Sequence, residues 1–400
     1  MNTPWLHVIG IGEDGLVGLS APARGALEGA VAIFGGARHL AMVESVAPGA
    51  TRHAWPTPFA ALIDDIRAHR PCQVAVLATG DPLWYSVGEQ LATTFEPEEV
   101  AFYTQVSAFQ IAAARMGWSL ADCEMLTAHG RPVSQIMPYV APAQRLLILT
   151  AGVDTPFVVA SRLTEAGYGP SRLAVLTNMG GVEEMRFDGI AERWNTEVPA
   201  LHTLAVECVA GPQAQALPRT GLPDAAFEHD GKMTKSEVRA VTLARLCPAA
   251  GALLWDIGCG AGSVAIEWMR GARRARAVGI EPNASRCATA ARNAEALGAP
   301  GLQIISGRAP DALDGLEPPD AIFVGGGLSR EVFERAWSAL KPKGRLVANA
   351  VTLESEAMLL ALQSEYGGEL ARLSVARADP VGHLTGWRPL MPVTQWSHSK

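Results

Sequence analysis

The sequence predicts an α/β protein made of two domains. Its 400 residues suffice for two or three domains of ordinary size. Strand-sized apolar segments alternate with segments of helical spacing along the whole chain, which is typical of mostly parallel sheets covered by helices. A stretch with three prolines and no sustained period interrupts this alternation. We therefore expect one domain over residues 1–210, a linker over 211–228 and a second domain over 229–400.

In the first half, short runs rich in apolar and β-branched residues predict strands, and Ala-rich runs predict helices. The expected strands are 6–11, 31–34, 74–79, 100–103, 146–150, 173–177 and 201–208. The expected helices are 59–69, 87–94, 108–116 and 157–166. This order implies a mostly parallel sheet, in which ligands collect beyond the carboxyl ends of the strands.

The second half has a cleaner order, which predicts a doubly wound α/β domain. A helix is expected to start near Ser236, with Thr234 and Glu237 at the spacing of a capping box. The expected strands are 253–257, 277–280, 302–306, 321–324 and 346–350. The expected helices between and after them are 263–270, 285–297, 330–340 and 353–366.

Composition excludes several classes of protein. Apolar residues make up 48% of the chain, so it is globular and not disordered. The net charge of −7 argues against a nucleic-acid binder, which usually carries a basic face. No apolar run approaches the ~20 residues of a membrane span, and no secretory signal is visible. The six cysteines form no CxxC pair, which argues against a zinc site or a disulfide framework. We expect no metal and a cytoplasmic location.

A glycine loop follows the first strand of the second half. Gly258, Gly260 and Gly262 alternate with Cys259 and Ala261 directly after Asp256. This GxGxG spacing differs from the GxGxxG that cradles a dinucleotide pyrophosphate. Glu281 closes the next strand, where a carboxylate can accept both hydroxyls of a ribose. An acid and a glycine loop without a pyrophosphate site predict S-adenosylmethionine as the ligand.

Further residues of the same half extend this predicted site. The turn at Arg308 and Ala309 lies where the adenine would rest, and Gly325 follows the fourth strand. That strand lacks the Asn/Asp-Pro-Pro-aromatic motif of enzymes that methylate exocyclic amines, and its glycines leave room for a broad, flat substrate. Thr234 would cover the cofactor, and Lys235 or Arg239 would meet substrate carboxylates. The alternative for these three residues is a capped helix with a solvated face.

The first half carries different glycine turns. Gly10 follows its first strand, Gly80-Asp81-Pro82 follows the third, and Ser107-Ala108 precedes a helix. His129 and Arg131 lie in a later turn. Taken one at a time, each turn could be ordinary, and a lone histidine is more often structural than catalytic. Together, these segments resemble the tetrapyrrole (precorrin) methylase family over about residues 5–208.

That resemblance implies a class III methyltransferase fold, in which two α/β lobes enclose a cleft. Its cofactor residues would be Gly10, Gly80, Asp81, Pro82, Ser107 and Ala108. His129 and Arg131 become candidates for catalysis, and Arg131 and Arg115 for binding substrate carboxylates. Glu13 stands where many relatives have proline, and Glu-Asp-Gly is closer to the subgroup that methylates C5 of the ring.

The second half, about residues 226–390, is similar to a class I precorrin methyltransferase in segments 231–239, 255–263, 323–327 and 349–354. The fused pair resembles the precorrin-6Y C5,15-methyltransferase (decarboxylating) family of cobalamin (vitamin B12) biosynthesis. The resemblance implies two S-adenosylmethionine sites per chain, a tetrapyrrole substrate and self-association into a homo-oligomer. It also implies C5 methylation by the first domain, and C15 methylation with decarboxylation of the C12 acetate by the second, giving precorrin-8.

Three alternatives remain at this point. A methyltransferase acting on RNA or protein would need a basic surface or an amine-binding motif. A nicotinamide-dependent oxidoreductase would need GxGxxG, which is missing at Gly258. One lobe could also serve only as a scaffold, in which case the chain would bind one cofactor and not two.

Overall fold

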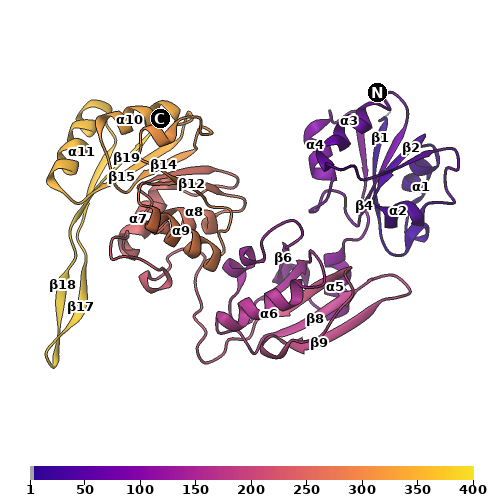
Figure 1. The fold of residues 1–400 in the computed structure, drawn as a ribbon, viewed down its shortest axis with the longest axis horizontal. Helices are drawn as coiled ribbons and strands as arrows, with labels where there is room; N and C mark the ends of the chain where they lie inside the picture. Colours follow the sequence, from indigo (N-terminus) through magenta and orange to yellow (C-terminus); the bar gives the residue numbers. More distant parts are fainter. Residues whose placement is uncertain (1–3) are drawn as a thin grey trace. The chain divides into compact units, whose positions relative to one another are not determined.

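The computed structural model describes residues 4–400 (Figure 1). The chain divides into two units, and each is described by itself. Unit 1 comprises the residues up to Arg131 together with Ala141–Gln215, and unit 2 comprises Pro132–Val140 and Ala216–Lys400. None of the helices in the described part of the chain is long and apolar enough to cross a membrane.

The first sheet of unit 1 is parallel throughout, with strand order β3-β2-β4-β1-β5. Every residue of the inner strand β1 is buried, because helices cover both faces of the sheet. Ile9, Ile33 and Leu77 pack on one face, and Val8 and Phe34 on the other, as the period of two along a strand requires. The strands are β1 (Leu6–Ile11), β2 (Ala32–Gly35), β3 (Thr51–Ala54), β4 (Val74–Thr79) and β5 (Val100–Tyr103). The helices are α1 (Ala21–Glu28), α2 (Ala37–Met42), α3 (Leu62–Arg67) and α4 (Gly88–Thr94).

The second sheet of unit 1 has the order β6-β7-β10-β8-β9 and is mainly antiparallel. Only β6 and β7 run parallel. The prediction of mostly parallel strands is therefore wrong for this sheet. Its last strand, β10, inserts between β7 and β8 and opposes both, and β8 returns directly into β9 without a crossover helix. The elements are β6 (Cys123–Thr127), β7 (Arg145–Leu149), β8 (Arg172–Thr177), β9 (Met185–Ile190), β10 (His202–Glu207), α5 (Ala108–Met116) and α6 (Thr155–Glu165).

Unit 2 contains a seven-stranded sheet of order β13-β12-β11-β14-β15-β19-β16. The first five strands are parallel, and β19 runs antiparallel to both of its neighbours. Helices cover both faces, as predicted for a doubly wound domain. The strands are β11 (Leu253–Ile257), β12 (Arg276–Glu281), β13 (Gln303–Ser306), β14 (Ala321–Val324), β15 (Arg345–Ala350), β16 (Glu369–Leu373) and β19 (Val393–Ser399). The helices are α7 (Ser236–Leu246), α8 (Ser263–Gly271), α9 (Ala284–Ala296), α10 (Arg330–Ala339) and α11 (Leu353–Tyr366).

A two-stranded antiparallel ribbon extends from this sheet (yellow in Figure 1). It consists of β17 (Ala376–Val381) and β18 (Leu384–Pro389). Leu384 and Trp387 are each 78% exposed on it. Arg377 on β17 forms ion pairs with Asp224 and Glu237, so the ribbon is tied to the start of α7.

The segment predicted as a linker is partly core. Leu222 and Phe227 are buried in the cluster beneath α7 and α8. The carboxylate of Glu267 accepts the backbone N–H groups of Gly221 and Leu222 at 2.5 and 3.1 Å. From residue 216 onward the predicted linker therefore belongs to unit 2, and the observed division differs from the predicted boundary.

Unit 2 also includes a short segment from the first half of the chain. The 3₁₀ helix η4 (Val133–Tyr139) packs at the end of α9, where a Cβ on Gly298 would lie 2.3 Å from Pro138. The guanidinium of Arg219 lies 4.3 Å from the centroid of the Tyr139 ring. The remaining 3₁₀ helices are η1 (Gly15–Val17), η2 (Phe59–Ala61), η3 (Leu120–Asp122), η5 (Ala191–Arg193), η6 (Asp224–Ala226) and η7 (Asp311–Leu313).

Candidate functional site

The glycine loop of unit 2 lies where the sheet order reverses, because β11 pairs with β12 on one side and β14 on the other. The N–H groups of Gly258 and Cys259 donate to Ile280 O at 2.9 and 3.1 Å. Gly325 N donates to Ile257 O at 2.9 Å. The loop, the end of β12 and the turn after β14 therefore meet at one edge of the sheet.

Two glycines of this loop are required by the fold itself. Gly258 has φ +74°, and a Cβ there would lie 2.9 Å from the backbone N and O of Gly326. Gly262 has φ +78°, and a Cβ would lie 3.2 Å from the Cβ of Ala290 on α9. Glycine lets the two backbone turns approach each other and lets α8 start close to α9. The loop spacing thus reflects tight packing around the space that a ligand would enter.

Glu281 is buried at the end of β12 and faces this loop. Its Oε2 accepts the backbone N–H of Gly260 at 3.0 Å, and its Oε1 accepts that of Asn283 at 3.0 Å. An ionised carboxylate offers about four acceptor positions, so each oxygen keeps one for a further donor. This geometry fits the predicted role of Glu281 as an acceptor for ribose hydroxyls.

Asp256 supplies a second buried carboxylate directly before the loop. Its Oδ2 accepts the N–H of Ala265 at 3.0 Å, whereas Oδ1 is buried with no hydrogen-bond partner in residues 4–400. Burial raises the pKa of Asp256 to about 7, and the negative charge of Glu281 adds to this rise. A buried acceptor without a partner is costly, so this oxygen can still accept a hydrogen bond from a ligand that enters beside the loop.

The segment before α7 passes next to the glycine loop. The carbonyl oxygen of Lys232 lies 3.6 Å from where a Cβ of Gly260 would stand. Lys235 is half-buried directly before α7, and no other group in the described chain pairs with its ammonium. Lys235 therefore fits the predicted contact with a substrate carboxylate.

The predicted capping box at the start of α7 is wrong. Lys235 and not Thr234 is the residue that precedes the helix, and its side chain caps nothing. Asp224 instead accepts the N–H of Ser236 at 2.9 Å. Glu237 pairs with Arg377. A carboxylate distant in sequence has taken the position that the local spacing assigned to a threonine.

Arg239 does not fit the predicted contact with substrate. It is fully buried, and it forms ion pairs with Glu267 at 2.6 Å and Asp224 at 3.3 Å. It also donates to the carbonyl oxygens of Thr234 and Leu222. Arg239 therefore neutralises Glu267 and holds the chain around Thr234, and it is a structural residue of unit 2.

The remaining predicted residues of unit 2 lie at the same edge. Gly307 N donates to Glu281 O at 3.1 Å, which places Arg308 and Ala309 next to the end of β12. Arg308 and Gly325 are exposed, so both are accessible to a ligand. The structure therefore gathers the predicted cofactor residues of unit 2 at the carboxyl ends of its parallel strands.

In unit 1, three turns converge beyond the first sheet. A Cβ on Gly10 would lie 2.0 Å from Gly80 O and 3.0 Å from the Cβ of Gln105. Gly80 has φ +61°, and a Cβ there would lie 3.0 Å from Ser107 Cα and 3.6 Å from Ala108 N. The predicted cofactor residues on these turns are therefore neighbours, and the glycines permit the approach.

Two sequence signals of unit 1 also have a purely structural role. Ser107 and Gln110 form a capping box, in which Ser107 Oγ accepts from Gln110 N at 3.4 Å and Gln110 Oε1 accepts from Ser107 N at 2.8 Å. Asp81 Oδ1 accepts from Leu83 N at 2.8 Å, which stabilises the turn that contains Pro82. These bonds fix the turns, and the predicted contacts with a cofactor stay predictions.

The candidates for substrate contact in unit 1 differ in availability. His129 is exposed. The guanidinium of Arg131 lies 5.6 Å from the centre of the Tyr85 ring. Arg115 pairs through two nitrogens with Glu184, so its charge is already matched within unit 1.

Sequence reasoning missed a polar cluster around Arg38 and His39, which lies beside Gly80.

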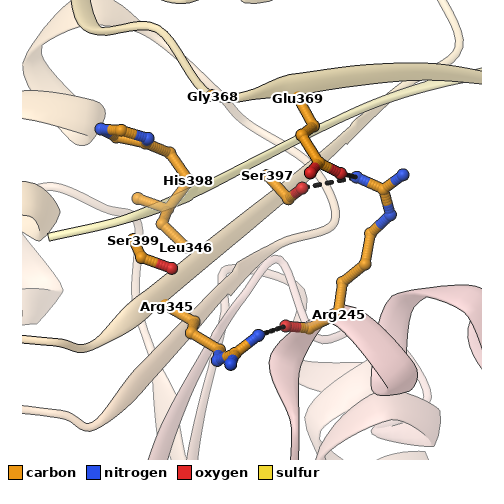
Figure 2. A pocket seen from close by; sticks show the side chains of 8 residues that line it. All are labelled: Arg245, Arg345, Leu346, Gly368, Glu369, Ser397, His398 and Ser399. Atoms are coloured by element: carbon orange, nitrogen blue, oxygen red, sulfur yellow. Dashed lines mark hydrogen bonds and ion pairs between the residues drawn. The ribbon is translucent and has the colours of Figure 1, made fainter.

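A cavity of about 390 Å³ lies elsewhere in unit 2, at the opposite ends of its parallel strands (Figure 2). Arg245 there binds Ser397 Oγ and pairs with Glu369, and Arg345 donates to Arg245 O at 3.2 Å. The full lining is Arg245, Arg345, Leu346, Gly368, Glu369, Ser397, His398 and Ser399. It contains no predicted site residue.

The fold and the relatives of this chain place it in the class of S-adenosylmethionine-dependent methyltransferases. Two family models match it: one described as "Precorrin methyltransferase domain" over residues 225–400, and one described as "Tetrapyrrole (Corrin/Porphyrin) Methylases" over residues 5–189. A precorrin-6Y C(5,15)-methyltransferase [decarboxylating] from Sinorhizobium sp is 45% identical over 401 residues, covering 100% of this chain and 97% of that protein. The enzyme of the same name from Mycobacterium tuberculosis (strain ATCC 25618 / H37Rv) is 38% identical over 398 residues, covering 98% of this chain and 99% of that protein.

The chain therefore belongs to the precorrin-6Y C5,15-methyltransferase (decarboxylating) family. Among solved structures, the C-terminal domain of precorrin-6Y C5,15-methyltransferase from Rhodobacter capsulatus is 45% identical. It covers 46% of this chain and 100% of its own, with a TM-score of 0.44.

Proposed function

We propose that this chain methylates C5 and C15 of precorrin-6Y and removes the C12 acetate as carbon dioxide, in the assembly of the corrin ring of cobalamin. The relatives that carry this name match nearly the whole chain. The observation that carries the proposal is the buried pair Asp256 and Glu281 at the glycine loop. Asp256 has one oxygen without a hydrogen-bond partner and Glu281 has spare acceptor positions, as the donor groups of a nucleoside ligand would require.

We assign C5 methylation to unit 1, and C15 methylation and decarboxylation to unit 2. The assignment is supported by the family models, because the tetrapyrrole methylase match lies in the first half and the precorrin methyltransferase match in the second. Each unit would hold one S-adenosylmethionine, which supplies a methyl group on a sulfonium. The proposal requires no metal.

In unit 2, Glu281 would accept the ribose hydroxyls and Asp256 would accept a further hydrogen bond from the cofactor. Thr234 would cover the site, and Arg308 and Ala309 would border the base. The loop residues Gly258, Cys259, Gly260, Ala261 and Gly262, with Gly325, would form the backbone wall. In unit 1, the corresponding wall would consist of Gly10, Gly80, Asp81, Pro82, Ser107 and Ala108.

The reaction depends more on aligning the substrate carbon with the methyl group of the cofactor than on a strong base. A reduced macrocycle supplies an enamine-like carbon that attacks the methyl group, and the product cation loses a proton from a ring nitrogen. In decarboxylation, the electron pair of the breaking carbon–carbon bond enters the protonated ring and leaves an exocyclic methylene, which then gains a proton to become a methyl group. The chain has to orient the reactants and exclude water. Lys235 would orient the substrate through one of its carboxylates.

The test is to incubate the pure chain with S-adenosylmethionine and the reduced precorrin under anaerobic conditions, and to determine the product mass. We expect a gain of two methyl groups, a loss of one carbon dioxide and release of two S-adenosylhomocysteine molecules. A product that gains neither methyl would overturn the proposal.

Calorimetry with S-adenosylhomocysteine tests the proposed stoichiometry of two sites per chain. A single site would make one unit a scaffold. The expected self-association into a homo-oligomer is tested separately by light scattering, in which a monomer would contradict it.

A further inference from the structure

A second polar cluster lies at the carboxyl end of the first sheet of unit 1. It joins Glu13 from the loop after β1, Arg38 and His39 from the start of α2, and Thr79 from the end of β4. Arg38 Nη2 donates to His39 Nε2 at 2.8 Å and to Thr79 Oγ1 at 3.2 Å. Thr79 Oγ1 lies 3.0 Å from His39 Nε2, and Arg38 pairs with Glu13 through its other terminal nitrogen.

Two neutral acceptors, His39 Nε2 and Thr79 Oγ1, hold one terminal nitrogen of the Arg38 guanidinium. Burial, together with the adjacent charge of Arg38, lowers the pKa of His39 to about 4. At neutral pH, His39 is therefore uncharged, and its Nε2 accepts a hydrogen bond without repelling the arginine. A guanidinium fixed in this way has little conformational freedom left, so a ligand loses little binding free energy in ordering it.

The other terminal nitrogen of Arg38 pairs with the carboxylate of Glu13. The Arg38 side chain is 33% exposed and that of Glu13 is 18% exposed, so both partners of this ion pair are partly exposed. Another carboxylate can replace that of Glu13, because it pairs with Arg38 in the same way and brings further contacts of its own.

The cluster adjoins the turns that we assign to the cofactor of unit 1. Thr79 directly precedes Gly80, whose carbonyl oxygen occupies the place where a Cβ of Gly10 would lie. Arg38 combines a fixed guanidinium with a position beside the proposed reaction centre.

We propose that Arg38 is a binding site for a carboxylate of the tetrapyrrole substrate in unit 1, and that Glu13 fills this site until the substrate displaces it. His39 and Thr79 are positioning residues that act through Arg38. This inference rests on the proposed function, because it takes the polycarboxylate substrate of C5 methylation as the ligand.

The test measures each methylation separately in the full chain, with S-adenosylmethionine whose methyl carries a heavy carbon isotope and with NMR of the product. C15 methylation and carbon dioxide release in unit 2 are the internal reference. If the wild-type chain methylates neither carbon, the proposed function fails. If it methylates both carbons, variants of Arg38, Glu13 and His39 test whether Arg38 binds the substrate.

Arg38→Ala should raise the KM of C5 methylation about 10- to 100-fold, the scale of a lost charge-assisted hydrogen bond, with a smaller change in kcat. Arg38→Lys should lie between, because it keeps the charge and loses the planar fork. Glu13→Gln should lower the KM, because it removes the competing carboxylate. The matched control is Arg24→Ala, which breaks an exposed pair with Glu28 on α1 and should change neither reaction.

His39 provides an independent check. His39→Leu should raise the KM of C5 methylation, whereas His39→Gln should restore it, because an amide oxygen can accept from Arg38 in place of Nε2. If Glu13→Gln raises the KM as Arg38→Ala does, the pair is only a structural tie and the inference is overturned. An unchanged KM in Arg38→Ala overturns it equally. For any variant that melts early, the affinity of unit 1 for S-adenosylhomocysteine separates misfolding from lost substrate binding.

Discussion

The carboxylate of Glu281 accepts the backbone N–H of Gly260 at 3.0 Å, so the acid that ends β12 holds the glycine loop that follows β11. The same carboxylate also accepts the N–H of Asn283, which starts α9. Glu281 thus orders the loop before any ligand arrives. The contact expected to bind a ribose and the contact that shapes the site belong to one side chain.

Replacing Glu281 should therefore weaken cofactor binding in unit 2 alone. Glu281→Ala removes a buried acceptor from Gly260 and from the ligand, which costs about 1–3 kcal/mol of binding free energy. Glu281→Gln keeps one acceptor and should cost less. Calorimetry with S-adenosylhomocysteine should show one weakened site and one unchanged site per chain. Loss of both sites would contradict two independent sites.

Gly258→Ala should abolish cofactor binding in unit 2. The new Cβ would lie 2.9 Å from the backbone of Gly326, so the loop or the turn after β14 must move. Gly251→Ala is the matched control, because its φ is also +74° but a Cβ there would meet nothing within 4 Å. The control should cost about 1–2 kcal/mol of stability from backbone strain and leave binding intact. Equal loss of binding in both variants would show that backbone strain alone is responsible.

Asp256 should make the stability of unit 2 depend on pH. Its pKa rises to about 7 because the carboxyl is buried, so the folded unit keeps a proton that the unfolded chain releases. The stabilising contribution is complete below about pH 4 and is lost as the pH rises to about 7. Asp256→Asn preserves the acceptor for Ala265 N and cannot titrate.

The measurement is the urea midpoint of unit 2 for both proteins across this range. The wild type should lose stability relative to Asp256→Asn as the pH increases. A difference between the two proteins that stays constant with pH would show that Asp256 does not titrate there.

Arg239→Met should destabilise unit 2 by about 3–5 kcal/mol, the cost of leaving one partner of a buried ion pair without the other. The partner left behind is Glu267, which is fully buried. Arg276→Met is the control, because its pair with Glu317 is half exposed on both sides and contributes about 0–1 kcal/mol. Urea unfolding followed by tryptophan fluorescence compares them, and equal midpoints would refute the structural role of Arg239.

Local patterns were sufficient to predict most of the sheet cores. Strands such as β1, β4 and β11 are buried on both faces, so their sequences are continuous apolar runs. The missed strands β3, β6, β9 and β16 lie at sheet edges and have mixed sequences. β19 was also missed, although it lies inside its sheet, because polar Thr394 and Gln395 interrupt its apolar pattern. The β17–β18 ribbon escaped prediction because it contains proline and few consecutive apolar residues.

The candidate site could be predicted where a motif is contiguous, as in the glycine loop and the Gly-Asp-Pro turn. The prediction failed where the role of a side chain depends on partners that are distant in the sequence. Arg239 is buried because Glu267 and Asp224 surround it, and neither lies within a helical turn of it in sequence. Arg38 and His39 were missed because Thr79, which completes their cluster, comes 40 residues later.

The position of β19 has a consequence for synthesis of the protein. This strand fills the gap between β15 and β16 and carries Trp396 into the core, yet it follows both neighbours in the sequence. While the ribosome is still translating the ribbon, β15 has an unpaired edge and the core beneath it lacks its tryptophan. Nascent chains at that stage expose the unpaired backbone N–H and C=O groups of β15, so translation pauses there should favour aggregation or binding by chaperones.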